Sequence, residues 1–371
     1  MSPWKAAKPF DSIREIDTPA LILDLDAFER NLAKMQQSLS GSPVRLRPHA
    51  KSHKCPEIAT RQIALGAVGI CCQKVSEAAC FVDHGIQDIL VTNQVVGSTK
   101  LHHLMALARR ARIGVLVDHP EQVMALSAAA TTYDANLDVY VEVDVGAGRC
   151  GVAPGEETAL LAQAIHMAPD LNFAGLQCYH GTAQHLRTPE QRVAAIRHAS
   201  NVAQQSRAAI ETLGIKVPII TGAGTGSFTH ERDSGVFNEI QAGSYIFMDR
   251  DYADNQRGHD DPVFEHALFV LTAVMSINQP GKVVVDAGLK ASSVDSGMPG
   301  VWQKPGYQYT KASDEHGVVT LPPGERLSLG EQLWLIPGHC DPTVNLYDEL
   351  ICVRDGKVEA IWPIAGRGAV L

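Results

Sequence analysis

The sequence has no apolar run long enough to span a membrane, and its first residues contain no apolar signal-peptide segment. It also has no excess of positive charge, because 32 Lys and Arg stand against 41 Asp and Glu, for a net charge of −9. A chain this acidic is a poor candidate for binding nucleic acid or an anionic membrane surface. None of its eight cysteines forms a CxxC pair, and 371 residues need no disulfides, so we expect reduced thiols and a cytoplasmic protein.

Strand-like and helix-like segments alternate from residue 18 to about residue 245. Pro19–Leu25 is apolar and extended, and Asp26 is the predicted N-cap of a helix over Ala27–Gln37. Eight further strands are predicted at Val44–Arg47, Gly69–Cys72, Asp88–Thr92, Ile113–Val117, Leu137–Asp144, Phe173–Tyr179, Val217–Thr221 and Glu239–Gln241. Helices are predicted between them, among others at Ser76–Asp83, Glu121–Ala130, Glu156–Met167 and Pro189–Leu213. Eight βα units favour a (β/α)8 barrel, with an open doubly wound sheet as the alternative.

Beyond residue 262 the helical periodicity disappears, and short β-rich runs separated by Gly and Pro replace it. We therefore predict a barrel domain over residues 18–261 and a β-rich domain over residues 262–371 together with residues 1–17. The polar, Asp-rich segment 246–262 forms the crossing. The predicted strands of the second domain are His266–Ile277, Val283–Asp286, Gly317–Leu321, Gln332–Ile336, Leu350–Val353 and Val358–Ile361.

Lys51 belongs to a basic run just after the first barrel strand. Within it, basic residues occupy alternate positions and would share one face of an extended segment, which is costly to bury unless it meets an anion. A lysine at a strand end among other bases is predicted to have a lowered pKa and to attack a carbonyl, as a Schiff-base lysine does. A solvated basic loop is the alternative. The alternating residues are Arg45, Arg47, His49, Lys51 and His53.

Further polar residues follow the ends of other predicted strands. Arg149 comes after the longest strand, and Tyr179, His180 and His185 come after the next one. The carboxyl ends of barrel strands form one face, and that face carries the chemistry of such folds. A surface arginine and structural histidines are the alternatives.

Two glycine-containing loops follow the last two barrel strands. Residues 221–227 read Thr-Gly-Ala-Gly-Thr-Gly-Ser, and residues 241–245 read Gln-Ala-Gly-Ser-Tyr. Glycines let backbone N–H groups approach an anion, and the hydroxyls add donors, so these loops predict a phosphate site. The spacing fails the dinucleotide fingerprint and lacks the lysine of a P-loop. A plain glycine-rich turn is the alternative.

His339 and Asp341 flank Cys340 in the β-rich domain. In an extended segment the imidazole and the carboxylate would share one face, with Cys340 turned away. One nitrogen and one oxygen make a partial divalent-metal site with open positions. A hydrogen-bonded histidine and a turn-capping aspartate are the alternative.

Together these residues resemble the fold-type III pyridoxal-phosphate enzymes, which share the alanine-racemase barrel. Within that family the chain most resembles the D-threonine aldolase and D-serine dehydratase branch, over residues 17 to 368. The resemblance rests on the order and spacing of Arg47-Pro48-His49-Ala50-Lys51, Cys178-Tyr179-His180 with His185, Thr221–Ser227 and His339-Cys340-Asp341.

The resemblance implies a role for each of these residues. Lys51, and not Lys54, would form the Schiff base with pyridoxal 5'-phosphate. Arg149 would face the pyridine nitrogen and leave it unprotonated, which makes the ring a weaker electron sink. Tyr179 would lie beside the cofactor, and His339 and Asp341 would bind a divalent metal. The phosphate would be held by Gly222, Gly224, Thr225, Gly243 and Ser244.

The metal pair separates the activities of this branch. Dehydratases resemble H-x-C, a softer site suited to Zn²⁺, whereas aldolases resemble H-x-D, a harder site suited to Mn²⁺ or Mg²⁺. His339-Cys340-Asp341 favours an aldolase that cleaves D-β-hydroxy-α-amino acids, such as D-threonine, to glycine and an aldehyde, with His185 or a metal-bound water as general base and Lys51 as catalytic lysine. A D-serine or D-3-hydroxyaspartate dehydratase is the second hypothesis.

Two other hypotheses remain open from the sequence. A racemase needs two opposed bases and no metal, and a non-catalytic cofactor carrier would consist of the barrel alone. The H-x-D pair argues against the first and the second domain against the other. The resemblance also implies a homodimer.

Overall fold

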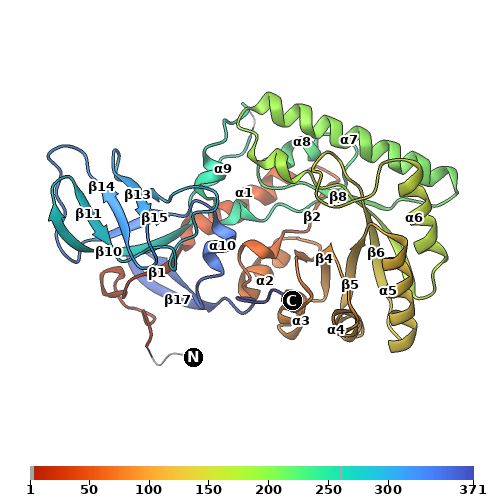
Figure 1. The fold of residues 1–371 in the computed structure, drawn as a ribbon, viewed down its shortest axis with the longest axis horizontal. Helices are drawn as coiled ribbons and strands as arrows, with labels where there is room; N and C mark the ends of the chain where they lie inside the picture. Colours follow the sequence, from red (N-terminus) through yellow and green to blue (C-terminus); the bar gives the residue numbers. More distant parts are fainter. Residues whose placement is uncertain (1–3, 260) are drawn as a thin grey trace.

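Two sheets organise the chain in a computed structural model that describes residues 4–259 and 261–371 (Figure 1). One is a parallel sheet wrapped by helices, on the right of Figure 1, and the other is a largely antiparallel sheet, on the left. In the described part of the chain, no helix combines the length and the apolar character needed to cross a membrane.

The parallel sheet has eight strands in the order β2-β9-β8-β7-β6-β5-β4-β3. A parallel bridge between His49 and Cys71 joins its two ends, so the sheet curls into a barrel and the alternative of an open sheet is wrong. All eight predicted strands are present: β2 (Arg45–Leu46), β3 (Ile70–Cys72), β4 (Asp88–Gln94), β5 (Arg112–Val117), β6 (Leu137–Glu142), β7 (Leu171–Gln177), β8 (Ile219–Gly222) and β9 (Glu239–Ile240).

Helices cover the outside of this barrel (Figure 1). Their starts follow local rules. At the longest helix, the Thr188 side chain accepts from the Gln191 N–H, and Pro189 occupies a first-turn position where no intrahelical N–H is needed. The helices are α2 (Pro56–Ala64), α3 (Val75–Asp83), α4 (Ser98–Ala108), α5 (Pro120–Tyr133), α6 (Glu156–Met167), α7 (Pro189–Thr212) and α8 (Phe228–Arg232).

The first strand of the chain, β1 (Ala20–Asp24), lies in the second sheet and not in the barrel. It pairs antiparallel with β10 (Leu268–Gln279) and parallel with β16 (Glu349–Arg354). Helix α1 (Leu25–Leu39) then leads to the barrel. The prediction of Asp26 as its N-cap is wrong: the Asp24 side chain accepts from the Ala27 N–H at 3.0 Å, so the helix begins two residues earlier.

The second sheet follows the order β13-β14-β11-β10-β1-β16-β17, and β15 pairs with both β10 and β12. The six strands predicted there are present. Two were missed: β12 (Gly300–Val301) is very short, and β13 (Gln308–Ala312) carries only one buried residue, Tyr309, so neither gives a period-two signal. The remaining strands are β11 (Lys282–Val285), β14 (Gly317–Thr320), β15 (Gln332–Ile336) and β17 (Lys357–Pro363).

The second sheet brings its own loops to the mouth of the barrel. Helix α10 (Cys340–Val344) follows β15 and packs against the short 3-10 helix η2 (Ala50–Ser52) that follows β2. The crossing segment contains the short helix α9 (Arg250–Ala253). A shared apolar cluster that includes Leu23, Phe247 and Leu335 packs the two parts together. The domain limits at 18–261 and 262–371 stay a prediction.

Candidate active site

A cavity of about 290 Å³ opens where the barrel strands end and α10 approaches them. The side chains that line it come from both sheets. Among the predicted site residues, it gathers Lys51, Arg149, Tyr179, Gly224, Thr225, Gly243, Ser244 and Asp341. A larger cavity of about 440 Å³ shares Thr225 and Tyr252 with it but is lined by no lysine, so the smaller cavity is the candidate site.

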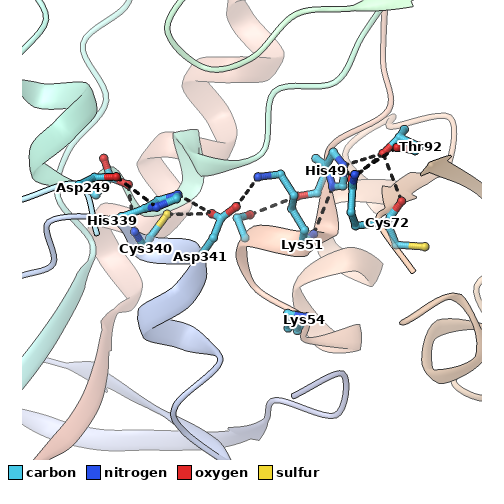
Figure 2. Close-up of polar contacts among 12 residues, drawn as sticks. His49, Lys51, Lys54, Cys72, Thr92, Asp249, His339, Cys340 and Asp341 are labelled. Atoms are coloured by element: carbon cyan, nitrogen blue, oxygen red, sulfur yellow. Dashed lines mark hydrogen bonds and ion pairs between the residues drawn. The ribbon is translucent and has the colours of Figure 1, made fainter. Parts of the chain in front are cut away.

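Lys51 meets Asp341 across the cavity (Figure 2). The Lys51 Nζ donates to the Asp341 Oδ2, which joins the barrel to the second domain. Burial alone would lower the pKa of Lys51, but the Asp341 carboxylate outweighs it and raises that pKa. The expectation of a lowered pKa is therefore wrong for the chain by itself, because the nearest charge is an anion from a segment 290 residues away. The same ion pair holds the pKa of Asp341 well below its usual range, against the effect of burial.

The basic run does not present one face. Strand β2 ends at Leu46, and the η2 turn breaks the alternation. Arg47 turns below the cavity, where its Nε donates to Glu239 at 3.1 Å and its Nη1 to Asp88 at 2.5 Å. His49 stays in the site, with its Nε2 2.9 Å from the Thr92 hydroxyl, and burial lowers its pKa to about 3, so it is a neutral ring.

Lys54 does not line the cavity, and Figure 2 shows it apart from the contact between Lys51 and Asp341. Its Nζ donates to Glu77 at 2.5 Å, and both side chains are buried. The second oxygen of Glu77 accepts the N–H groups of Gln73 and Lys74 at the start of α3. Lys54 is thus committed to a buried ion pair, which distinguishes it from Lys51.

The glycine loop is packed too tightly for side chains. A Cβ on Gly224 would lie 2.5 Å from the Gln184 Oε1, and a Cβ on Gly243 would lie 2.5 Å from the His49 carbonyl oxygen. The Thr225 Oγ1 is buried without a partner in the described structure. The Thr225 hydroxyl is thus a buried donor without an acceptor, in a glycine-rich loop that has no room for larger side chains. These features fit a phosphate group. Gly222 lies in β8, outside the lining residues, where its Cβ would meet the Cys178 carbonyl oxygen at 2.6 Å.

Arg149 and Tyr179 also line the cavity. The Arg149 Cζ lies 5.8 Å from the centre of the Tyr179 ring, and its Nη2 lies 3.6 Å from the Glu142 Oε1. Glu142 is in turn fixed by Gln94, which donates to its other oxygen at 2.5 Å. The guanidinium therefore lies near a buried carboxylate, while the Arg149 side chain is 55% exposed.

His185 ends the 3-10 helix η3 (Gly181–His185) and lies beside the cavity without lining it. Its Nδ1 is 2.6 Å from the Asp251 Oδ2, and the Arg187 Nη2 donates to the other oxygen at 2.6 Å. The hydrogen bond to Asp251 raises the pKa of His185, against partial burial. His180, in contrast, has its Nδ1 beside the Thr182 hydroxyl at 3.1 Å.

His339 is placed by a carboxylate that was not among the predicted site residues. Its Nδ1 lies 2.9 Å from the Asp295 Oδ2, which leaves its Nε2 4.0 Å from the Asp341 Oδ1 (Figure 2 shows the histidine and Asp341). Two ligands about 2.1 Å from one ion can be this far apart. Within residues 4–259 and 261–371, no group of three or more His, Cys, Asp or Glu is placed to hold a metal ion.

Sequence reasoning missed the segment between the domains. Asp249 is fully buried, and its oxygens accept the N–H groups of Tyr252 at 3.0 Å and of Cys340 at 3.0 Å. Tyr252 lines the cavity, and Asp251 holds His185. The Asp-rich composition of residues 246–262 could have indicated that this segment belongs to the site. The same composition is equally typical of a solvated linker. Other lining residues that were not predicted are Thr92 and Gln177.

Comparison with protein families gives two matches that divide the chain. The N-terminal domain of alanine racemase matches residues 23–251, and a putative serine dehydratase domain matches residues 267–353.

Individual proteins match over nearly the full length. The chain is 51% identical to a D-threonine aldolase from Arthrobacter sp over 98% of this chain and 96% of that protein. It is 46% identical to a 3-hydroxy-D-aspartate aldolase from Paracoccus denitrificans (strain Pd 1222), over 95% and 93%. The crystal structure of D-threonine aldolase from Filomicrobium marinum superimposes with a TM-score of 0.97 at 50% identity, covering 99% of this chain and 100% of that one.

Proposed function

Because the chain belongs to the fold-type III family of pyridoxal-phosphate enzymes and is a lyase, we propose that it cleaves D-threonine and related D-β-hydroxy-α-amino acids to glycine and an aldehyde, with a divalent cation. One observation supports this most directly: Asp341 of the H-x-D motif lines the same cavity as Lys51 and contacts its Nζ. A cation ligand within reach of the cofactor lysine is what the metal-assisted reaction requires.

Different residues of the cavity would bind different parts of the cofactor and the cation. Lys51 would hold pyridoxal phosphate covalently, Thr225 and Ser244 would donate to its phosphate, and Arg149 would face its pyridine nitrogen. When bound, the cofactor supplies an electron sink for the pair released as the Cα–Cβ bond breaks. His339 and Asp341 would hold the cation, which makes a nearby hydroxyl more acidic.

The proton transfers fall to two residues. The His185 Nε2, which has no partner in the described structure, takes the proton of the β-hydroxyl as the Cα–Cβ bond breaks and the aldehyde carbonyl forms. Lys51, as an ammonium, returns a proton to Cα, which gives glycine. Tyr179 lines the same cavity as Lys51 and would pack against the cofactor ring.

The aldolase is favoured over the dehydratase by the position of Cys340. Its side chain is fully buried in α10, its N–H donates to Asp249, and it does not line the cavity, whereas Asp341 does. The pair that faces the cavity is therefore nitrogen and oxygen, which suits Mn²⁺ or Mg²⁺ better than a thiolate site for Zn²⁺.

Product analysis tests the proposal. Purified protein with cofactor is incubated with D-threonine, D-serine or D-3-hydroxyaspartate, with and without Mn²⁺. We expect aldehyde and glycine from D-threonine, with Mn²⁺ required. A keto acid and ammonia as the main products would establish the dehydratase instead, and interconversion of D- and L-amino acids would establish a racemase.

Three further expectations accompany the proposal. A homodimer would appear in analytical ultracentrifugation as about twice the mass of the 40.0 kDa chain. A cytoplasmic location would appear in cell fractionation. Limited proteolysis near residue 261 would test the predicted domain boundary.

A further inference from the structure

The hydrogen bond between His185 and Asp251 fixes which nitrogen of the histidine is free. The Asp251 Oδ2 lies 2.6 Å from Nδ1, and a carboxylate can only accept, so a neutral imidazole in this position carries its proton on Nδ1. The lone pair of the neutral ring is then on Nε2. That is the state a general base needs.

Contacts from Arg187 fix the position of Asp251. Its side chain is 6% exposed, and the Arg187 Nη2 donates to its Oδ1 at 2.6 Å while the Arg187 Nη1 donates to its carbonyl oxygen at 2.6 Å. The Arg187 Nη1 also reaches the Asn255 side-chain oxygen at 2.8 Å. The arginine keeps Asp251 ionised and prevents it from rotating away from the imidazole.

The segment that carries Asp251 also holds the loop of the metal pair. The Asp251 N–H donates to the Gly338 carbonyl oxygen at 3.2 Å, the Arg250 N–H donates to that of Pro337 at 3.0 Å, and Asp249 accepts from the Cys340 N–H at 3.0 Å. Residues 249–251 therefore touch the histidine on one side and the His339 loop on the other.

We propose that Asp251 is the positioning residue of the lyase reaction, which orients His185 with its basic Nε2 toward the β-hydroxyl and fixes its distance from the metal pair. This inference rests on the proposed role of His185 as general base. A purely structural ion pair between Arg187 and Asp251 would need no contact with the histidine, yet His185 is the second partner of the carboxylate.

The test compares Asp251→Asn, Asp251→Glu and His185→Gln, with Asp254→Asn as the matched control. Asp254 is exposed, follows α9 directly and undergoes the same chemical change without touching His185. We expect Asp251→Asn to lower kcat on the order of 10²-fold or more, with KM and cofactor absorbance nearly unchanged, because the amide can force the proton onto Nε2. Asp251→Glu should have a higher kcat than Asp251→Asn, because it keeps the carboxylate. The double variant Asp251→Asn with His185→Gln should be no slower than His185→Gln alone.

A second readout does not depend on activity. The cofactor-free protein is labelled with ¹⁵N-histidine, and the resonances that are absent from the spectrum of His185→Gln identify His185. We expect the neutral ring of His185 to be protonated on Nδ1 in the wild type and in Asp254→Asn, but not in Asp251→Asn.

A wild-type tautomer or a wild-type kcat in Asp251→Asn overturns the inference while leaving the proposed aldolase activity intact. If His185→Gln itself retains full kcat, the general base lies elsewhere and both the base assignment and the inference fall. If the wild-type protein releases no aldehyde, the proposed function fails. The tautomer measurement then still decides whether Asp251 orients the His185 ring.

Discussion

The two halves of the site are built in different ways. The cofactor half, which comprises Lys51, Arg149, Tyr179 and the loops 222–227 and 243–244, comes from barrel strand ends and is shaped by backbone and by missing side chains. The proton half of the proposed mechanism comprises His185, His339 and Asp341, and its two imidazoles each contact a carboxylate from outside the barrel strands, Asp251 and Asp295. The glycine loops of the first half are shaped by close packing, whereas the two histidines of the second half are fixed by charged partners.

Asp341 connects the halves, because it pairs with Lys51 and belongs to the proposed cation site. Lys51 would hold the cofactor through its Nζ, and Asp341 would then be free to bind the cation.

The largest expected effect comes from removing the lysine of the cofactor half. Lys51→Ala should abolish the visible absorbance of the bound cofactor and lower aldehyde release below detection. The control is Lys54→Met combined with Glu77→Gln, which replaces the buried pair together and avoids an unpaired charge worth about 3–5 kcal/mol. The control should keep the absorbance. The reverse pattern in spectra would assign the cofactor to Lys54.

Chelation should separate the two halves. Removal of the cation from the proton half should lower aldehyde release on the order of 10³-fold, because Lewis-acid stabilisation is worth several kcal/mol, while the cofactor absorbance stays nearly intact. Mn²⁺ or Mg²⁺ should restore the rate, and Asp341→Cys should shift the preference toward Zn²⁺. Full activity after exhaustive chelation would remove the cation from the reaction and reopen the racemase hypothesis.

A smaller effect is expected from crowding the glycine loop. In Gly224→Val the new Cβ would lie 2.5 Å from the Gln184 Oε1, which accepts from the Gly226 N–H, so the loop must shift. Overpacking of about 1–3 kcal/mol corresponds to roughly 5- to 150-fold weaker cofactor binding, measured by equilibrium dialysis. Gly300→Val is the control, because its Cβ meets nothing closer than 3.7 Å. Equal cofactor retention by both variants would place the phosphate elsewhere.

The smallest effect on the reaction is expected at Glu231, which lies behind the glycine loop and accepts from the Ser227 hydroxyl at 2.8 Å. Burial raises its pKa to about 7, from 4.5 when unfolded, so the folded protein holds a proton that the unfolded chain has lost between these values. Stability therefore falls by about 3 kcal/mol as pH rises from 4.5 to 7. Denaturant unfolding of the cofactor-free protein should show Glu231→Gln more stable than wild type at pH 8, with the difference closing toward pH 4.5. A constant difference would mean that the carboxyl group does not titrate in this range.

The barrel was predictable because its strands are apolar and separated by helices with ordinary caps, so each element carries its own signal. Strand β1 carries the same signal but lies in the other sheet, since periodicity says nothing about which strand is the neighbour. In the site, too, local sequence signals were predictable and spatial neighbours were not. The strand-end position of Lys51 predicted its place in the cavity, whereas its raised pKa depended on Asp341, a partner distant in sequence.

The sequence by itself determined the eight βα units, the β-rich second part, the glycine loops and the H-x-D pair, because each depends on neighbours within a few residues. Only the tertiary structure decided that Asp341 faces Lys51 and that Glu77 neutralises Lys54. It also decided that the carboxylates of Asp251 and Asp295 contact the rings of His185 and His339. The physical reason is that charge acts through space: the field at a side chain is set by whatever the fold places within a few ångströms of it, and local pattern carries no record of that placement.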